Sequence, residues 1–217
     1  LSARTRRRMQ PIEERVTAAL ADSGQGCAEL ETVDPAAAGQ SRYIRDYAGC
    51  PAFQNTLADY YPLGDDAFPA MLEALRAAQH YIFMEYFIVE PGEMWDAILA
   101  ALREKAAAGV EVRFLYDDLG SIMTAPAGYD RTLRRMGIQA RRFNPFIPVV
   151  SSRFNNRDHR KICVVDGHTG FTGGINLADE YINRVVKHGH WKDTVVRLQG
   201  DAVYSLTMMF LSLWDYC

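Results

Sequence analysis

The sequence lacks any apolar run approaching the roughly 18 residues that a membrane-spanning helix needs. No segment of this chain is therefore predicted to cross a bilayer. It also lacks internal repeats and low-complexity tracts, which excludes repeat architectures and long biased linkers.

Cysteine is scarce, with four residues in 217, and none shows CxxC or another metal-ligand spacing. One of them lies inside a strongly apolar stretch, so we expect reduced cysteines, as in a cytosolic setting. The four are Cys27, Cys50, Cys163 and Cys217.

Positive charge is not in excess, since 24 Lys and Arg stand against 27 Asp and Glu, a net charge of -3. This balance gives no general attraction to nucleic acid, and no basic stripe lies near the motif described below. We therefore expect no nucleic-acid partner. The exception is a basic tip on a predicted helix over residues 5–22, which would be solvated or would face anionic lipid. Its residues are Arg4, Arg6, Arg7 and Arg8.

Apolar residues make up 48% of the chain and charged residues 24%, as in a soluble protein with a full core. The length allows one large domain, with or without an appended arm. Because the chain starts at Leu1 rather than Met, we expect it to be a piece of a longer parent protein. The lack of a predicted membrane-spanning helix in this piece says little about that parent.

Hydrophobic periodicity predicts strands over 81–89, 110–117 and 137–143, with helices before and between them. This alternation indicates parallel strands with helices packed on the sheet. Two short strands, 161–166 and 169–174, form a predicted hairpin, and 194–198 adds another strand before a C-terminal helix. Residues 23–64 are predicted to be an irregular arm. The expected fold class is α/β, a mixed and mostly parallel β-sheet sandwiched by helices.

The stretch "DHRKICVVDGHTGFTGGIN" (158–176) carries the clearest chemical signal. His159 and Lys161 share a face at a strand entrance, where an imidazole can be a nucleophile and an ammonium can hold an anionic oxygen. Gly173 and Gly174 allow close backbone approach, and Asn176 offers an amide donor. An isolated His-x-Lys is usually a solvated strand end, but the combination predicts a phosphate site with a built-in nucleophile.

These residues resemble the HKD motif of the phospholipase D superfamily, with His159, Lys161 and Asp166 as its three members. Further stretches are similar to bacterial cardiolipin synthases, and the resemblance covers residues 42–217. Asp158 and Lys192 stand where Asn and Arg are expected. The similar stretches are "MEYFI", "LYDDLGS", "FNPF" (143–146), "RFNNRDHRKICVVDG" (153–167), "GGINLADEY" (173–181) and "HWKDT" (190–194).

The resemblance implies catalytic roles. His159 would attack phosphorus and form a phosphohistidine, while Lys161 and Asn176 would hold the non-bridging oxygens. Asp166 matches the carboxylate of the motif, with a structural role at the strand end. Asp193 stands where the family supplies the carboxylate that orients the histidine; the alternative is a surface charge before a strand. No cofactor is implied.

The superfamily site uses two HKD motifs, and this chain has one. "HWKDTVVR" repeats His-x-Lys but ends in Arg197 where aspartate is needed. The second histidine must come from a C-terminal half or from a homodimer. We therefore expect residues 1–41 to be a basic juxtamembrane-like helix with an irregular arm, and residues 42–217 to be the first of two catalytic modules, inactive alone.

The implied function is a phosphatidyltransferase that joins two phosphatidylglycerols into cardiolipin and glycerol. Expected partners are anionic phospholipid and a membrane surface, with the parent at the cytoplasmic face of a bacterial membrane and this piece soluble. The alternatives are a phospholipase D-type phosphodiester hydrolase and an inactive half-module that only binds phosphate.

The remaining candidates concern substrate and metal. Glu85, in an apolar strand, is predicted to pair with a pocket donor or to form a structural pair. Phe143 and Phe146 belong to a proline-rich loop that is either core or a lipid-facing lip. Gly173 and Gly174 complete the predicted substrate-binding set. No metal is expected, because a polar loop accounts for His188 and His190, and a loop cap for Asp117 and Asp118.

Overall fold

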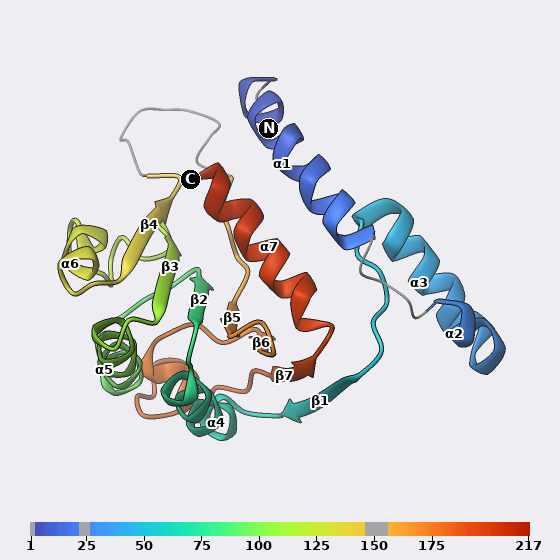
Figure 1. Ribbon diagram of the computed structural model, residues 1–217. Helices are drawn as coiled ribbons and strands as arrows, with labels where there is room; N and C mark the ends of the chain where they lie inside the picture. Colours follow the sequence, from blue (N-terminus) through green and yellow to red (C-terminus); the bar gives the residue numbers. More distant parts are fainter. Residues whose placement is uncertain (1–2, 22–26, 146–155) are drawn as a thin grey trace.

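The computed structural model describes residues 3–21, 27–145 and 156–217 (Figure 1). Its centre is a seven-stranded mixed sheet in the order β1-β7-β6-β5-β2-β3-β4. The strands are β1 Thr56–Tyr61, β2 Tyr81–Tyr86, β3 Glu111–Asp117, β4 Gln139–Phe143, β5 Ile162–Val165, β6 Thr169–Gly173 and β7 Val195–Gly200.

The mixed α/β class is confirmed, but the predicted predominance of parallel strands is wrong. Among the named strands of the described residues, only β2–β3 and β3–β4 pair in parallel. The pairs β1–β7, β2–β5, β5–β6 and β6–β7 are antiparallel. The reason is that β5, β6 and β7 follow one another as an antiparallel run, while β1, which was not predicted, adds an antiparallel edge.

Helices cover both faces of the sheet (Figure 1). On one face lie α4 Gly64–Ala77, α5 Glu93–Ala107 and α6 Tyr129–Arg135, and on the other lies α7 Val203–Tyr216. Strand residues alternate between the two cores, as a pleated strand requires. Thus Ile82 and Met84 face the first set of helices, whereas Phe83 faces α7.

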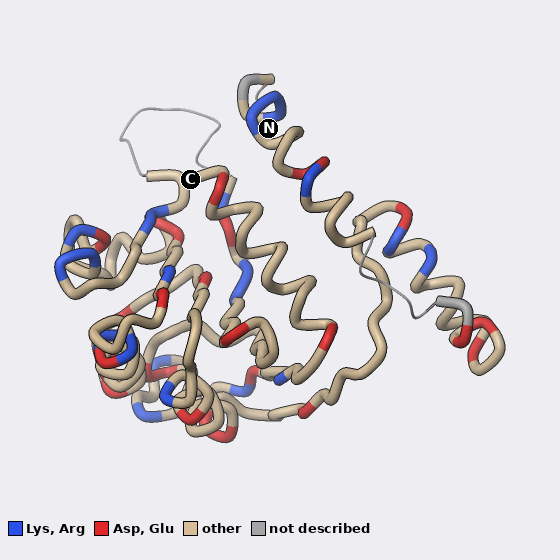
Figure 2. The backbone as a smooth tube through the Cα atoms, viewed as in Figure 1, with Lys and Arg blue, Asp and Glu red and all other residues tan. Residues whose placement is uncertain are grey.

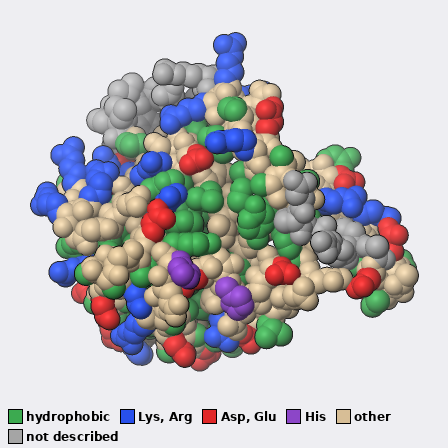
Figure 3. All heavy atoms as spheres, viewed as in Figure 1, with side chains coloured by type: hydrophobic (Ala, Val, Ile, Leu, Met, Phe, Trp, Pro, Cys, Tyr) green, Lys and Arg blue, Asp and Glu red, His purple; other side chains and the backbone are tan. Residues whose placement is uncertain are grey.

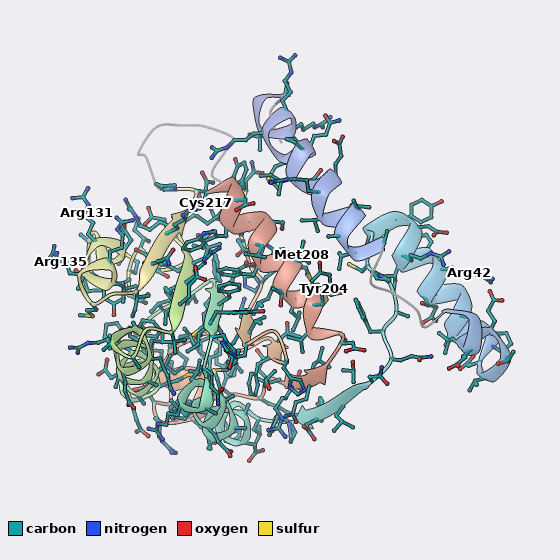
Figure 4. All side chains as sticks on the ribbon, in the orientation of Figure 1. Arg42, Arg131, Arg135, Tyr204, Met208 and Cys217 are labelled. Atoms are coloured by element: carbon teal, nitrogen blue, oxygen red, sulfur yellow. The ribbon has the colours of Figure 1, made fainter. Side chains whose placement is uncertain are left out.

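The C-terminal helix α7 buries the stripe that its sequence predicts. Val203, Leu206, Phe210 and Trp214 are all buried against the sheet. Its other side is partly open, with Tyr204 and Met208 along it and Cys217 just beyond its end (Figure 4). Hydrophobic side chains gather over this part of the molecule in the space-filling view (Figure 3).

The N-terminal segment is helical rather than irregular, which corrects the prediction for residues 23–64. It contains α1 Ala3–Ala21, α2 Cys27–Val33 and α3 Pro35–Ala48, before β1. The missed signal is Asp34, the residue before Pro35. Its carboxylate accepts from the backbone N–H groups of Ala36 and Ala37, as is usual for the residue that caps a helix start. The predicted domain boundary between residues 41 and 42 falls inside α3.

Helix α1 packs along α7, and α2 and α3 pack on each other away from the sheet (Figure 1). Ile12 and Leu20 are the buried apolar residues of α1. No helix in the described ranges combines the length and the apolar character that crossing a membrane demands.

Candidate active site

The motif residues gather where β5 begins and β2 ends. These two ends share one edge of the sheet because β5 runs antiparallel to β2, with Glu85 opposite Ile162. His159 and Lys161 lie in the extended segment that enters β5. The carboxyl end of β3 reaches the same edge, since β3 is parallel to β2.

His159 and Lys161 both contact one aromatic ring, that of Phe87, directly after β2. The imidazole centroid lies 4.8 Å from the phenyl centroid, and Lys161 Nζ lies 5.5 Å from it. Lys161 also donates to the carbonyl of His159 at 2.6 Å. The structure therefore brings the predicted nucleophile and the predicted cation together on one surface, with His159 exposed.

Lys161 is nearly buried, with 4% of its surface exposed. Burial lowers the pKa of its ammonium to about 8, and the charges of Asp158 and Asp193 oppose that shift. A half-desolvated cation of this kind binds an anionic oxygen more strongly than a solvated lysine does, because water competes less for it.

Phe87 was not assigned a role from the sequence, although it belongs to the "MEYFI" stretch. Its position depends on the turn after β3. A Cβ on Gly120 would lie 2.4 Å from the Phe87 carbonyl oxygen and 2.7 Å from its ring. The Ser121 hydroxyl donates to the same carbonyl at 3.2 Å and accepts from the N–H of Val89 at 3.1 Å. The "LYDDLGS" stretch thus holds the ring that supports His159.

Asn176 is buried and tied to the chain after β2. Its Oδ1 accepts from the N–H of Ile88 at 3.0 Å, and its Nδ2 donates to the Tyr181 hydroxyl at 2.8 Å. An amide nitrogen has two hydrogens, so one remains for an anionic oxygen. Tyr181, the last residue of "GGINLADEY", is a second residue that sequence reasoning left without a role.

The two glycines serve the start of β7 rather than a ligand. A Cβ on Gly173 would lie 2.1 Å from the carbonyl oxygen of Thr194, and one on Gly174 would lie 2.0 Å from Asp193 Oδ1. Asp193 can therefore sit close to the motif strand, where its charge acts on Lys161. In the part of the chain that the structure describes, no hydrogen bond joins Asp193 to His159; its carboxylate accepts from the N–H of Thr194 at 2.8 Å.

Asp166 lies at the opposite end of β5 from His159, seven residues of extended chain away, or roughly 23 Å. Its carboxylate accepts from the backbone N–H groups of Gln79, His80 and Tyr81 at 2.7 to 2.8 Å. Burial would raise its pKa, but these hydrogen bonds outweigh burial, so the pKa is lowered. Asp166 therefore fixes the start of β2, which agrees with the structural role expected for it at the strand end; its place in the catalytic set stays a prediction.

Glu85 faces α7, away from the side chains of His159 and Lys161, and is fully buried. Arg160 Nε lies 2.7 Å from Glu85 Oε1. Of the two alternatives for Glu85, the structure shows the pair with a neighbouring charge, and its role in substrate binding stays a prediction.

Phe143 is half-buried at the end of β4, and its ring centroid lies 6.3 Å from that of Tyr216. It packs against the α7 core. It also lines a cavity of about 440 Å³ between α1, the end of β4 and the end of α7, together with Arg8, Met9 and Leu213. Phe146, the other half of the predicted lip, lies outside the described residues.

The acidic and imidazole groups considered as metal ligands have other partners or lie apart. Asp117 is buried and accepts from the N–H groups of Leu119 and Gly120 at 2.9 Å, which makes it a loop cap. His188 and His190 lie on an exposed loop. Within residues 3–21, 27–145 and 156–217, no group of three or more His, Cys, Asp and Glu side chains is placed to hold a metal ion.

Taken together, the edge offers an exposed imidazole, a desolvated ammonium and one free amide hydrogen. This set can attack a phosphorus atom and hold two of its oxygens. Among the residues described at this edge, none is a second acid of the kind that a departing alcohol requires.

Comparisons with known proteins agree with this chemistry. A family model described as cardiolipin synthase, PLD-like domain, matches residues 71–214. The chain is 42% identical to a cardiolipin synthase of Geobacillus thermodenitrificans over 154 residues, which cover 70% of this chain and 30% of that protein. It is 41% identical to a cardiolipin synthase of Staphylococcus aureus over 156 residues, covering 71% of this chain and 31% of that one. An uncharacterized protein of Streptococcus mutans is 45% identical over 175 residues, covering 81% of this chain and 38% of it. The chain thus spans about a third of the length of these curated relatives.

Solved structures share the fold at low identity. Nuc, a phospholipase D family member from Salmonella typhimurium, has a TM-score of 0.52 at 19% identity, covering 75% of this chain and 93% of that chain. A phosphatidylserine synthase from Haemophilus influenzae has a TM-score of 0.52 at 16% identity, covering 68% of this chain and 34% of that chain.

Proposed function

The chain belongs to the cardiolipin synthase family of phospholipase D-like proteins, and from this premise we propose that it supplies the nucleophilic half of a phosphatidyl-transfer site. The observation that carries the proposal is the placement of His159 and Lys161 on the Phe87 ring at an open sheet edge. The proposed substrate is phosphatidylglycerol, and the proposed products are cardiolipin and glycerol.

In the first proposed step, a ring nitrogen of His159 attacks phosphorus and the bond from phosphorus to the glycerol oxygen breaks. Glycerol leaves with a proton from a general acid, and the phosphatidyl group stays on His159 as a phosphohistidine. In the second step, the hydroxyl of another phosphatidylglycerol attacks phosphorus, the bond to His159 breaks, and the hydroxyl proton returns to the base. Lys161 and Asn176 hold the non-bridging oxygens throughout.

Asp193 is proposed to orient His159 once substrate is bound. Catalytic hydrogen bonds are often longer or absent before the substrate complex forms. Its support in this chain is the close approach that Gly174 allows and its charge effect on Lys161.

The general acid is proposed to come from a second HKD half, either further along the same chain or in a second copy. The support is that the relatives are about three times as long as the stretch matched here. A single HKD half is then expected to be inactive without its counterpart.

The proposed partner surface is an anionic bilayer at the cytoplasmic face of the membrane. Arg6, Arg7 and Arg8 are exposed near the start of α1, and Lys and Arg also gather on α6 (Figure 2). Arg131 and Arg135 point away from α6 (Figure 4). Each basic residue near an anionic surface contributes about 1 kcal/mol of attraction.

Product analysis tests this function. The whole protein is given phosphatidylglycerol labelled in its phosphate, in anionic vesicles, and the labelled products are counted. Cardiolipin with free glycerol is expected to dominate. Phosphatidic acid as the main product would show a hydrolase instead, and binding of vesicles without any product would show a phosphate-binding module.

A further inference from the structure

A buried charge cluster flanks His159 in the sequence. Asp158 and Arg160 stand on either side of it, and because alternate residues of an extended segment point in opposite directions, both face away from its imidazole. Arg160 Nε lies 2.7 Å from Glu85 Oε1 and 3.1 Å from Asp158 Oδ1. Glu85 is 0% exposed and Asp158 is 7% exposed.

The cluster holds two carboxyl groups and one guanidinium, and among the described residues neither oxygen of Glu85 has a hydrogen bond of good geometry. The ion pair with Arg160 supplies charge but leaves these oxygens without a well-aligned donor. Two ionised carboxylates can only accept, and they repel each other at short range. A single proton lets one carboxyl donate to the other and leaves one negative charge, which Arg160 balances.

Burial places that proton on Glu85. It raises the pKa of Glu85 well above the ordinary value; Arg160 opposes the shift and the charge of Asp158 adds to it. Two further ionisable groups interact electrostatically with the cluster, Lys161 from the same segment and Cys217 after α7; Arg141 from β4 and Arg8 from α1 act in turn on Cys217. Arg141 is held by the Trp214 carbonyl and stacks on its ring at 4.3 Å.

The cluster is connected to the site on both sides. The N–H of Asp158 donates to Asp117 Oδ2 at 3.1 Å, which ties the segment to the turn after β3. Arg160 ties the same segment to β2 through Glu85. The charge of Asp158 also raises the pKa of Lys161, whereas no such influence of Glu85 on Lys161 is present.

We propose that Glu85, Asp158 and Arg160 form a carboxyl pair that shares one proton with Arg160 as its counter-ion, and that this unit positions His159 and keeps Lys161 charged. The role in catalysis rests on the proposed transfer reaction. Glu85 and Asp158 are positioning residues in it, since neither faces the imidazole.

A double-mutant cycle in the whole protein tests whether Glu85 and Asp158 share one proton. It compares Glu85→Gln, Asp158→Asn and the double variant. Either single change leaves one carboxyl to balance Arg160, because Glu85 ionises when Asp158 is gone. The double variant leaves the partly exposed guanidinium of Arg160 without either carboxylate, so its Tm is expected to fall about 5 °C further than the sum of the single losses. Additive losses would overturn the proposal. Asp59→Asn, which breaks an exposed pair with Arg197, is the matched control.

Two further readouts need no turnover. A neutral carboxyl group has its own infrared C=O band, which is expected in the wild type at pH 7 and absent in Glu85→Gln. Its absence from the wild type would contradict the shared proton even if a variant failed to fold. Lysine ¹⁵Nζ NMR is expected to show the pKa of Lys161 falling in Asp158→Asn and unchanged in Glu85→Gln; equal shifts in both would overturn the positioning role.

The transfer reaction gives the last readout. If Lys161 must be charged, activity falls as the pH rises through about 8, the pKa of Lys161. This alkaline limb is expected to move to lower pH in Asp158→Asn and to stay in place in Glu85→Gln. A merely structural pair would lower the rate at every pH alike. If the protein shows no transfer at all, the proposed function fails. The Tm cycle and the spectra still test whether Glu85 and Asp158 share one proton.

Discussion

Lys161 carries an electrostatic cost that the proposed phosphate-binding role would account for. Its ammonium is nearly buried, and it interacts with the His159 carbonyl oxygen, the Phe87 ring and the charges of Asp158 and Asp193. A pKa lowered from 10.5 to about 8 means that the folded state disfavours the charged form. The protein retains this destabilising cation at the one place where an incoming anionic oxygen would compensate it.

Replacement of Lys161 by methionine is therefore expected to stabilise the fold while abolishing transfer. At pH 7 the free energy of unfolding should rise by about 1 to 3 kcal/mol, since each unit of pKa shift corresponds to about 1.4 kcal/mol. The penalty on the ammonium is complete below pH 8 and disappears as the pH rises toward 10.5, so the gain should shrink over that window. Activity should fall by about 10²-fold or more.

The measurement is urea unfolding at pH 7 and pH 10, with Lys192→Met as the control on an exposed lysine. A Lys161→Met variant that is less stable than the wild type at pH 7 would show that the hydrogen bond to His159 outweighs desolvation.

Tyr181 is expected to matter through Asn176. Tyr181→Phe removes the hydroxyl that Asn176 Nδ2 donates to at 2.8 Å. A buried amide hydrogen left without a partner costs about 1–3 kcal/mol, and the amide becomes free to rotate away from the phosphate position. Both stability and transfer rate should therefore fall. Tyr204→Phe, on the open side of α7 (Figure 4), should change neither, and equal effects of the two variants would contradict this role.

At the scale of elements, Asp166 joins two strands rather than taking part in chemistry. Its carboxylate holds the backbone N–H groups of residues 79–81, at the start of β2, from the turn after β5. In Asp166→Asn the side chain keeps one acceptor oxygen, but its NH₂ group replaces the other oxygen and faces a backbone N–H group of residues 79–81. The free energy of unfolding should fall by about 1.5–3 kcal/mol, the usual contribution of a hydrogen bond to a charged group.

The pH dependence separates this effect from others. The pKa of Asp166 is lowered, so its contribution is present above about pH 3.8 and is lost as the pH falls through the lowered value. The difference in stability between wild type and Asp166→Asn should therefore narrow below that pH. Transfer per folded molecule should be unchanged, and a large loss in kcat at full folding would return Asp166 to the catalytic set.

The elements with strong local patterns were predictable, and the pairing of distant ones was not. The strand predicted over 110–117 is β3, Glu111–Asp117, and the predicted hairpin is β5–β6. Strand β1 was not predicted, because its apolar residues Leu57 and Tyr60 are exposed. The segment therefore lacks the alternation of apolar and polar residues that indicates a half-buried strand. Its place in the sheet depends on β7, more than 130 residues later.

The site shows the same division. A common site for His159, Lys161 and Asn176 could be predicted from the sequence, because all three lie in one short stretch of the chain. The surroundings of Glu85 could not be predicted from the sequence. They depend on which helix covers its face of the sheet, and in the structure this helix is α7. Phe87 contacts His159 across segments far apart in the chain, which no local pattern reveals. Tyr181 is only five residues from Asn176, but their hydrogen bond depends on how the chain turns after β6.

At the scale of the molecule, the account requires a partner for the site. Among its described residues the edge has the proposed nucleophile His159 but no acid for a leaving alcohol, a role worth about 10²–10⁴-fold in rate. This 217-residue chain alone is expected to be at least about 10²-fold slower than a protein with both halves. The measurement is the rate against concentration: a rate proportional to the square of concentration would indicate two copies completing one site. Full activity as a monomer would contradict the two-half account.

The most direct test of the central claim is to trap the covalent intermediate. The whole protein is mixed with phosphatidylglycerol carrying ³²P, quenched in alkali, in which phosphohistidine survives, and digested for mass spectrometry. The account predicts a phosphatidyl group on His159, lost in His159→Ala and absent from the exposed His168. Turnover that continues with no label on His159, or with the label on another residue, would contradict it.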